Sequence, residues 1–212
     1  MTYRGETAAT APPAAPVPAD RPEPWLFVRP GTPPVDGPAG AVLFGRDGTL
    51  LQNVAYNGDP AMVHPMAGIR AALTALRAAG FAVGVLSNQP GVSRGLLGRG
   101  EVVAVQARAE ALLGPIDVWA VCPHAAHDGC ACRMPAGALV TAACRALRLP
   151  PSRVTVIGCE DTVIAAALAV GAHAIRVPEA GRPLDDPGAP CTLTACRRAG
   201  GPEAAADLLL RR

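Results

Sequence analysis

Five short apolar stretches recur along the middle of this 212-residue chain, and segments with helical periodicity separate them. Short, continuous apolar runs of this kind are typical of strands buried on both faces. A regular alternation of such strands with helices predicts an α/β fold with a parallel, doubly wound (Rossmann-like) sheet. The predicted strands span residues 41–44, 81–86, 117–121, 154–157 and 172–177.

Helical segments are predicted between these strands and after the last one. Residues 67–79 illustrate the pattern, because Ile69, Leu73 and Leu76 recur at helical spacing before Gly80 ends the segment. In a doubly wound sheet, ligands bind beyond the carboxyl ends of the strands, so the residues that follow each strand are where we look for a site. The predicted helices span residues 67–79, 100–113, 136–147, 161–170 and 203–210.

The two ends of the chain have a different composition. Residues 1–39 contain ten of the 23 prolines and are predicted to form a disordered Pro/Ala-rich tail, in which the apolar run 25–28 is a candidate for docking on the domain. The domain itself is expected over residues 40–177. Residues 178–212 are expected to form a loop and the short helix at 203–210.

The charge balance excludes some classes of binding partner. A formal net charge of +2 is too close to zero to indicate a protein that binds nucleic acid. All 19 basic residues are arginine, so chemistry that needs a lysine amine is excluded. The N-terminus does not resemble a signal peptide and no long apolar span occurs, so we expect a cytoplasmic protein with reduced thiols that binds neither membrane nor nucleic acid.

Polar motifs follow four of the predicted strands. Their order and spacing resemble those of the haloacid dehalogenase (HAD) superfamily, in the branch that contains D,D-heptose 1,7-bisphosphate phosphatase and histidinol-phosphate phosphatase. The resemblance spans residues 40–177 and implies a phosphoric monoester hydrolase fold with a zinc-binding loop. The motifs read GRDGT at 45–49, SNQ at 87–89, CPH through CACRMP at 122–135, and GCED at 158–161.

The first motif has lost its nucleophile. The resemblance implies an aspartate at position 45 that attacks phosphorus and a second aspartate, here Asp47, that serves as general acid and base. A carboxylate is required at the first position because it forms an acyl phosphate. Gly45 has no side chain, so covalent catalysis at this position is chemically impossible.

The second and third motifs are expected to hold phosphate. By resemblance, Ser87 and Asn88 bind the phosphoryl group, and Arg46 and Arg133 are further candidates for phosphate or substrate binding. The family places a lysine after the arginine of the third motif, but this chain has Met134, whose thioether supplies no positive charge.

The fourth motif has lost its metal carboxylates. The two acids that the family uses to bind and support Mg²⁺ correspond to Cys159 and Val163, neither of which offers the hard oxygen ligands that Mg²⁺ prefers. Glu160 and Asp161 are close but displaced in register. Cys159 has two interpretations: a thiol with a lowered pKa at a helix N-terminus, or a small residue that fills a vacated acid position.

A compact set of zinc ligands is predicted in the third motif. Cys122 and His124 form one pair and Cys130 and Cys132 form another, so that four ligands lie within eleven residues. Four protein ligands fit a closed, structural Zn²⁺ site, whereas a hydrolytic zinc would need an open position. The alternative is three loop thiols and a chance histidine, and His127 is expected to be solvated.

Three functions remain open from the sequence. The first is a phosphatase-like protein of the sugar-phosphate or histidinol-phosphate type whose catalysis is impaired. The second is an active phosphomonoesterase that hydrolyses a sugar phosphate, such as a heptose bisphosphate, through Asp47 and a water molecule. The third is an interaction module that uses the tail and Trp25. A small phosphorylated metabolite is the expected ligand in the first two, and no protein partner of the tail can be named.

Overall fold

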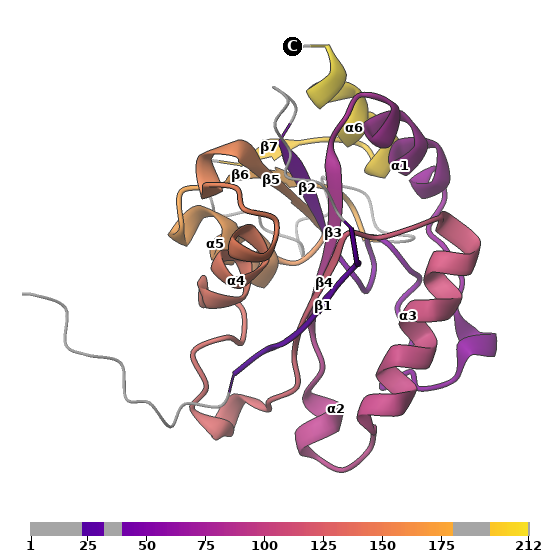
Figure 1. The fold of residues 1–212 in the computed structure, drawn as a ribbon, viewed down its shortest axis with the longest axis vertical. Coiled ribbons are helices and arrows are strands. Elements are labelled where there is room, and N and C mark those ends of the chain that lie inside the picture. The colour runs from indigo at the N-terminus through magenta and orange to yellow at the C-terminus, as the bar shows by residue number, and fades with distance from the viewer. Residues whose placement is uncertain (1–22, 32–39, 180–195, 212) are drawn as a thin grey trace, which may run out of the picture.

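The structure, a computed structural model, describes residues 23–31, 40–179 and 196–211. In these residues a seven-stranded sheet with the order β1-β4-β3-β2-β5-β6-β7 lies between two layers of helices (Figure 1). The expected α/β fold with a doubly wound sheet is confirmed. The strands are β1 (Trp25–Val28), β2 (Ala41–Gly45), β3 (Ala82–Asn88), β4 (Val118–Cys122), β5 (Val154–Gly158), β6 (His173–Arg176) and β7 (Arg197–Arg198).

All five predicted strands are present, and they pair in parallel. β2 lies at the centre between β3 and β5, and the chain runs outward from it in both directions. This reversal of winding direction beside β2 brings the carboxyl ends of β2, β3 and β5 together, which is where ligands bind in sheets of this type.

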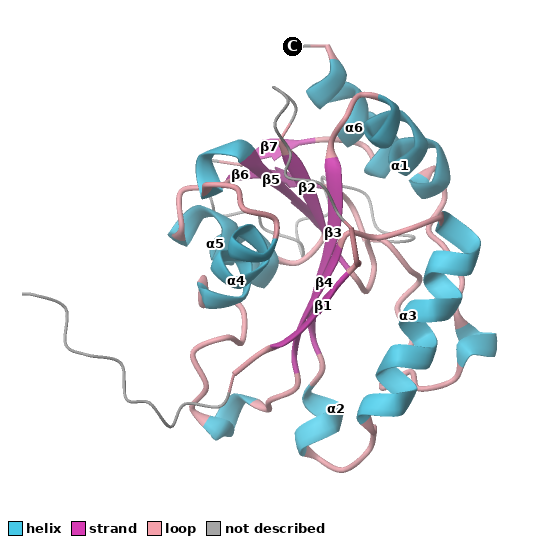
Figure 2. Ribbon diagram, viewed as in Figure 1, coloured by secondary structure: helices cyan, strands magenta, loops and turns pink. Residues whose placement is uncertain are grey.

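The helices cover both faces of the sheet (Figure 2). Helices α1, α3 and α6 lie on one side, and α4 and α5 lie on the other (Figure 1). Each helix that the sequence predicted is present within a few residues of its expected bounds. The helices are α1 (Ile69–Ala78), α2 (Pro90–Ser93), α3 (Arg99–Leu113), α4 (Ala138–Ala146), α5 (Asp161–Ala169) and α6 (Pro202–Leu210), with 3₁₀ turns η1 (Pro60–Met62), η2 (Ala126–Asp128) and η3 (Pro151–Arg153).

Each face of the sheet has its own apolar core. Val42 and Phe44 of β2 pack with one cluster, and Leu43 packs with the other, as the alternation of side chains along a strand requires. The sheet is tightly packed around Gly84, where an added Cβ would lie 2.5 Å from Leu43 Cδ2 and 2.6 Å from Val118 Cγ1. Glycine is therefore needed here for close approach rather than for an unusual backbone angle.

β1 adds an antiparallel strand to the edge formed by β4, so the whole sheet is mixed. Arg99 at the start of α3 stacks over the rings of Trp25 and Phe27 at 5.0 and 5.2 Å. Residues 25–28 thus dock on the domain, as their apolar character indicated, and they belong to the sheet. The prediction of a disordered tail is therefore wrong for residues 25–28, and residues 1–22 and 32–39 of that tail lie outside the described part of the chain.

Two short elements were not predicted. β7 lies within the segment 178–201 that was expected to be a loop, and α2 forms directly after β3. Residues 180–195 of that expected loop lie outside the described residues.

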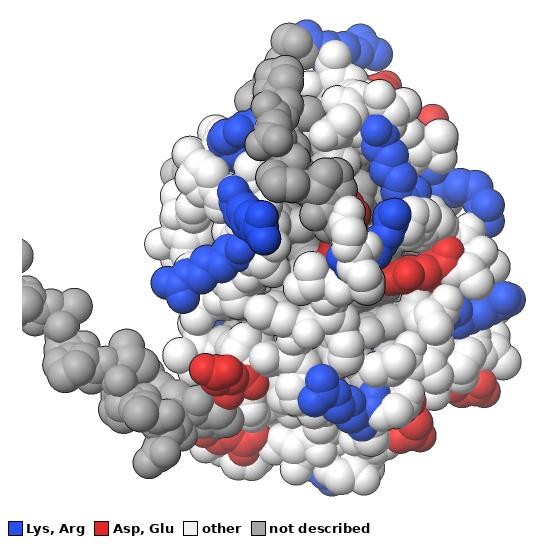
Figure 3. All heavy atoms as spheres, in the orientation of Figure 1, with Lys and Arg blue, Asp and Glu red and all other residues white. Residues whose placement is uncertain are grey.

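The distribution of charge and the length of the helices can be described directly. On the face shown in Figure 3, basic and acidic side chains are interspersed and do not form one large basic patch. Within the described ranges, every helix is too short or too polar to cross a membrane.

Candidate functional site

The four polar motifs meet at one cavity at the carboxyl ends of β2, β3 and β5. The cavity encloses about 350 Å³, including the part open to solvent. It brings together residues that are up to 118 positions apart in the chain, from Gly45 to Val163. The lining residues are Gly45, Arg46, Asp47, Thr49, Leu86, Ser87, Asn88, Met134, Cys159, Glu160 and Val163.

Gly45 ends β2 at the floor of this cavity, and its backbone does not require glycine. An added Cβ would lie 3.5 Å from Thr49 Oγ1 and 3.8 Å from Thr49 Cβ, which are ordinary van der Waals distances. The first atom of a longer side chain is therefore accommodated without strain.

Asp47 is held by the arginine beside it. Arg46 Nε lies 3.0 and 3.1 Å from the two carboxylate oxygens of Asp47. The arginine is 4% exposed, whereas the Asp47 side chain is 24% exposed. With the Gln89 amide oxygen turned toward Arg46, that oxygen accepts from Arg46 Nη2 at 2.7 Å. The guanidinium is thus engaged on two sides within the protein, and its charge is matched by the Asp47 carboxylate.

Ser87 and Asn88 are also bonded inside the protein. In the same orientation of Gln89, its amide oxygen accepts from Ser87 Oγ at 2.8 Å. Asn88 Nδ2 donates to the Met134 carbonyl and Asn88 Oδ1 accepts from the Met134 amide, both at 3.1 Å. Asn88 therefore fixes the backbone of residue 134 beside the cavity.

The inner part of the wall that follows β5, formed by Cys159 and Val163, is neutral and buried. Val163 packs so closely on Gly158 that a Cβ at Gly158 would lie 2.1 Å from Val163 Cγ1. The Cys159 amide donates to Thr49 Oγ1 at 3.0 Å. Burial raises the pKa of the Cys159 thiol, so the interpretation of Cys159 as a thiol with a lowered pKa is wrong.

Glu160 is the acid at this wall, and it lies at the exposed rim of the cavity. Its Oε2 accepts from Thr162 Oγ1 at 3.0 Å. Asp161 pairs with Arg176, whose guanidinium is largely buried. The two acids that follow Cys159 thus bond to other side chains.

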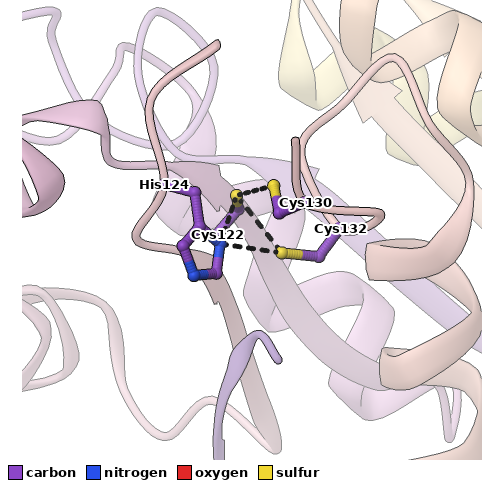
Figure 4. Close-up of side chains that lie close together, drawn as sticks. All are labelled: Cys122, His124, Cys130 and Cys132. Atoms are coloured by element: carbon purple, nitrogen blue, oxygen red, sulfur yellow. Dashed lines mark hydrogen bonds between the residues drawn. The ribbon is translucent and has the colours of Figure 1, made fainter. Parts of the chain in front are cut away.

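A second polar cluster lies in the segment 122–135, which we call the cysteine loop. The ligand atoms of four side chains lie within 4.8 Å of one another and point toward a common centre (Figure 4). Cys122 Sγ lies 3.3 Å from Cys132 Sγ and 3.7 Å from Cys130 Sγ. These separations are close to those of thiolates around Zn²⁺ with Zn–S bonds of about 2.3 Å. The four residues are Cys122, His124, Cys130 and Cys132.

Close contacts determine which nitrogen of His124 faces the sulfurs and shift the pKa values of two of the thiols. His124 presents Nδ1 to the sulfurs, at 3.3 Å from Cys132 Sγ. The hydrogen bond from the Cys132 thiol lowers the pKa of Cys122 to about 5, and the same contact raises the pKa of Cys132. His127, which was expected to be solvated, is exposed and pairs with Asp128 at 3.2 Å.

The Arg133 side chain points back onto the cysteine loop, to which the residue itself belongs. Its Nη1 donates to the His124 carbonyl at 3.0 Å, and it is not among the residues that line the cavity. Two residues that were not singled out as site residues take part in the site. Thr49 lines the cavity, is fully buried and bonds Cys159, whereas Gln89 does not line it but bonds Arg46. Both lie in the motifs that follow the strands, and that position was the available signal.

Comparisons with known proteins point to one group. No protein-family profile matches the chain. It is 32% identical over 141 residues to D-glycero-β-D-manno-heptose-1,7-bisphosphate 7-phosphatase from Pseudomonas putida, a match that covers 64% of this chain and 81% of the relative. The protein of the same name from Rhodopseudomonas palustris is 30% identical over 147 residues, with coverages of 64% and 82%.

Solved structures agree with these relatives. The crystal structure of D,D-heptose 1,7-bisphosphate phosphatase from B. bronchiseptica, complexed with magnesium and phosphate, superimposes with a TM-score of 0.71 at 26% identity. The match covers 81% of this chain and 98% of that chain.

Proposed function

Because the chain belongs to the heptose 1,7-bisphosphate phosphatase branch of the HAD superfamily, we propose that it is a phosphatase-like protein in which phosphoryl transfer is impaired. Gly45 carries this proposal. Phosphoryl transfer through an acyl phosphate requires a carboxylate at the nucleophile position, and this chain has a hydrogen atom there.

The general acid and base position is occupied but restrained. Asp47 is paired through both oxygens with the buried Arg46. Both carboxylate oxygens lie within hydrogen-bond distance of one guanidinium nitrogen, and this contact holds the Asp47 side chain against Arg46. This pairing opposes the alternative in which Asp47 and a water molecule hydrolyse the substrate directly.

Magnesium, which the B. bronchiseptica structure contains, does not fit the donor atoms at this site. The positions that correspond to the family's metal carboxylates carry a thiol at Cys159 and an isopropyl group at Val163. The carboxylates that do line the cavity are already bonded, Asp47 to Arg46 and Glu160 to Thr162. Mg²⁺ takes oxygen ligands in octahedral geometry, and soft sulfur ligands do not replace them. No step of the reaction is therefore assigned to Mg²⁺ in this protein.

Phosphate would meet few unpaired donors in the cavity. Arg46 is engaged with Asp47 and Gln89, and Asn88 is engaged with the backbone of Met134. Ser87 still lines the cavity, so we propose that a small phosphorylated metabolite is its ligand and that the grip is weaker than a charged site would give.

We also propose that the cysteine loop holds one structural Zn²⁺. Its four ligands would fill the tetrahedral positions, which leaves no open site for hydrolysis. The ion would brace the loop and so position Arg133, through the His124 carbonyl, and Met134 beside it. Thiol ligands at this site accord with the cytoplasmic location that the sequence favours.

The test is to restore the missing groups. The variant Gly45→Asp/Met134→Lys/Cys159→Asp, with Val163→Asp added in a second variant, is compared with the parent. Phosphate release from D-glycero-β-D-manno-heptose 1,7-bisphosphate is measured with Mg²⁺. We expect the parent to turn over about 10⁴-fold more slowly than ordinary enzymes, whose kcat is on the order of 10 s⁻¹, and the restored variants to gain activity.

A matched control separates true restoration from contamination. Asp47→Asn in the restored background should abolish the gained activity, while zinc content and circular dichroism show that each variant is folded. Turnover by the parent at ordinary enzymatic rates, lost in the parent Asp47→Asn variant, would instead establish the active phosphomonoesterase.

A further inference from the structure

A second cavity lies at the opposite end of the strands from the first, at the amino-terminal ends of β5 and β6. It encloses about 460 Å³, including the part open to solvent, and is bounded by β5, β6, β7, α5 and α6. It shares no residue with the cavity at the carboxyl ends of the strands.

Strand register explains why polar groups converge there. Thr155 is the parallel partner of His173, and Ile175 is the partner of Arg197. Partners in a parallel sheet share a face, and so do residues two apart along a strand, so all four side chains project from the same face. This is the face that α6 covers, because Ile175 and Leu209 belong to the same apolar cluster.

Thr155 is a polar residue at a position where its neighbours on the same face of the sheet are apolar. Its same-face neighbours Val42 and Ile157 are fully buried and apolar, whereas Thr155 is 6% exposed and polar. Its hydroxyl makes no hydrogen bond with any described residue. The hydroxyl is not among the polar atoms that are buried without a partner, so it is open to the cavity and available to a ligand.

Two further polar side chains at this cavity have no side-chain partner among the described residues. His173 and Arg197 are exposed, and neither forms an ion pair or a side-chain hydrogen bond there. None of the described residues that line the cavity is acidic. A guanidinium that is not neutralised by a neighbouring carboxylate retains its full donor fork for a planar anion.

The remaining wall is apolar. Ile175 and Leu209 line the cavity on the face of the sheet that α6 covers, and Leu168 lines it from α5 on the other face. An apolar wall with a few convergent polar groups is the usual construction of a site for a small organic molecule. One cation at the mouth matches one negative charge, and the apolar wall matches a hydrocarbon body.

From this geometry we propose that the cavity is a binding site for a small organic monocarboxylate. The carboxylate pairs with Arg197 and reaches the Thr155 hydroxyl, and the hydrocarbon part lies against the leucines and Ile175. The site is independent of phosphoryl chemistry and lies at the opposite end of the strands from the first cavity.

The experiment is a titration of the full-length ¹⁵N-labelled protein with benzoate, butanoate and inorganic phosphate, followed by NMR. We expect benzoate and butanoate to shift the amide resonances of Thr155, His173 and Ile175 and to leave Asn88 at the other cavity unmoved. Inorganic phosphate should not produce these shifts.

Variants test the proposed contacts. Arg197→Gln should weaken benzoate binding by about tenfold or more, because it removes a charge-assisted hydrogen bond. Thr155→Val, which keeps the shape of the side chain, should weaken it by roughly three- to tenfold. The matched control is Arg108→Gln, which removes an exposed arginine from α3 and should leave binding unchanged.

Three results would overturn the proposal. The first is the absence of shifts at these residues with benzoate or butanoate up to about 20 mM, which corresponds to negligible affinity. The second is binding that Arg197→Gln leaves unchanged. The third is a site that responds to inorganic phosphate and not to the carboxylates, which would exclude the proposed class of ligand.

Discussion

The cysteine loop and the cavity beside it both lie at the carboxyl ends of the strands, yet their polar residues differ sharply. The loop presents a complete set of four metal ligands within 4.8 Å. The cavity next to it, joined to the loop by Met134, presents glycine, methionine, cysteine and valine where its relatives' branch is expected to use charged groups.

The physical difference lies in what each set of groups does for the fold. Ligands of a structural ion contribute to folding stability whether or not catalysis occurs. Clustered carboxylates, in contrast, repel one another and are costly without a metal ion. Replacing them by neutral residues relieves that repulsion, so the two sites can diverge even though they are adjacent.

The largest expected effect is at the cysteine loop. Cys132→Ser should lower bound zinc from about one equivalent to a small fraction and destabilise the protein by several kcal/mol, on the order of 4 kcal/mol, as loss of a metal site does. Elemental analysis and urea unfolding measure both quantities.

The control for this prediction is Cys144→Ala, which removes a buried thiol of α4 that lies outside the ligand set. It should keep the full zinc content. A parent protein that contains no zinc after expression in metal-replete medium would remove the contrast between the two regions.

An intermediate effect is expected where the two regions meet. Asn88→Ala removes both side-chain bonds to the backbone of Met134 and leaves a buried donor and acceptor unpaired, which should cost about 2–3 kcal/mol. The exposed Asn53 provides the control, and Asn53→Ala should change the free energy of unfolding by less than about 0.5 kcal/mol. Equal effects of the two substitutions would show that Asn88 does not couple the loop to the cavity.

The smallest effect separates thiols of the loop from thiols of the core. Burial raises the pKa of Cys144 to about 11. The folded state therefore holds this proton more tightly than the unfolded state, whose thiol has a pKa near 8.5. The stabilisation is complete below about pH 8.5 and is lost as the pH rises through 11, with a loss of about 2 kcal/mol between pH 8 and pH 10.

Urea unfolding of the parent and of Cys144→Ala at pH 8 and pH 10 measures this loss. The difference in free energy of unfolding between the two proteins should shrink at the higher pH. A constant difference would mean that Cys144 does not titrate differently in the two states.

The sequence predicted the parts of the fold that have strong local signals. The central strand β2 and its neighbours are short runs made mainly of apolar residues, and their bounds agree with the structure within two residues. β7 could not be predicted, because two exposed arginines have no strand-like pattern and pair only through the edge of β6. The antiparallel direction of β1 could not be predicted either, since an apolar run of four residues carries no information about its partner.

The site residues divide in the same way, into those predicted from local spacing and those whose partners depend on the folded structure. The spacing of the four ligands in the cysteine loop is local, and the structure brings them together. The partners of Arg46, Asn88 and Arg133 depend on side-chain directions and long-range approach, which motif spacing does not contain. The structure places these side chains on Asp47, on the Met134 backbone and on the His124 carbonyl respectively.

The edge position of β1 has a consequence for how the chain folds. Trp25 pairs with Val121, a partner roughly a hundred residues later in the chain, and contacts of such large sequence separation close late because of the entropy of the intervening loop. During synthesis the aromatic side chains of β1 leave the ribosome long before β4 exists to receive them. The last step of folding is therefore expected to be the return of the first strand to the sheet.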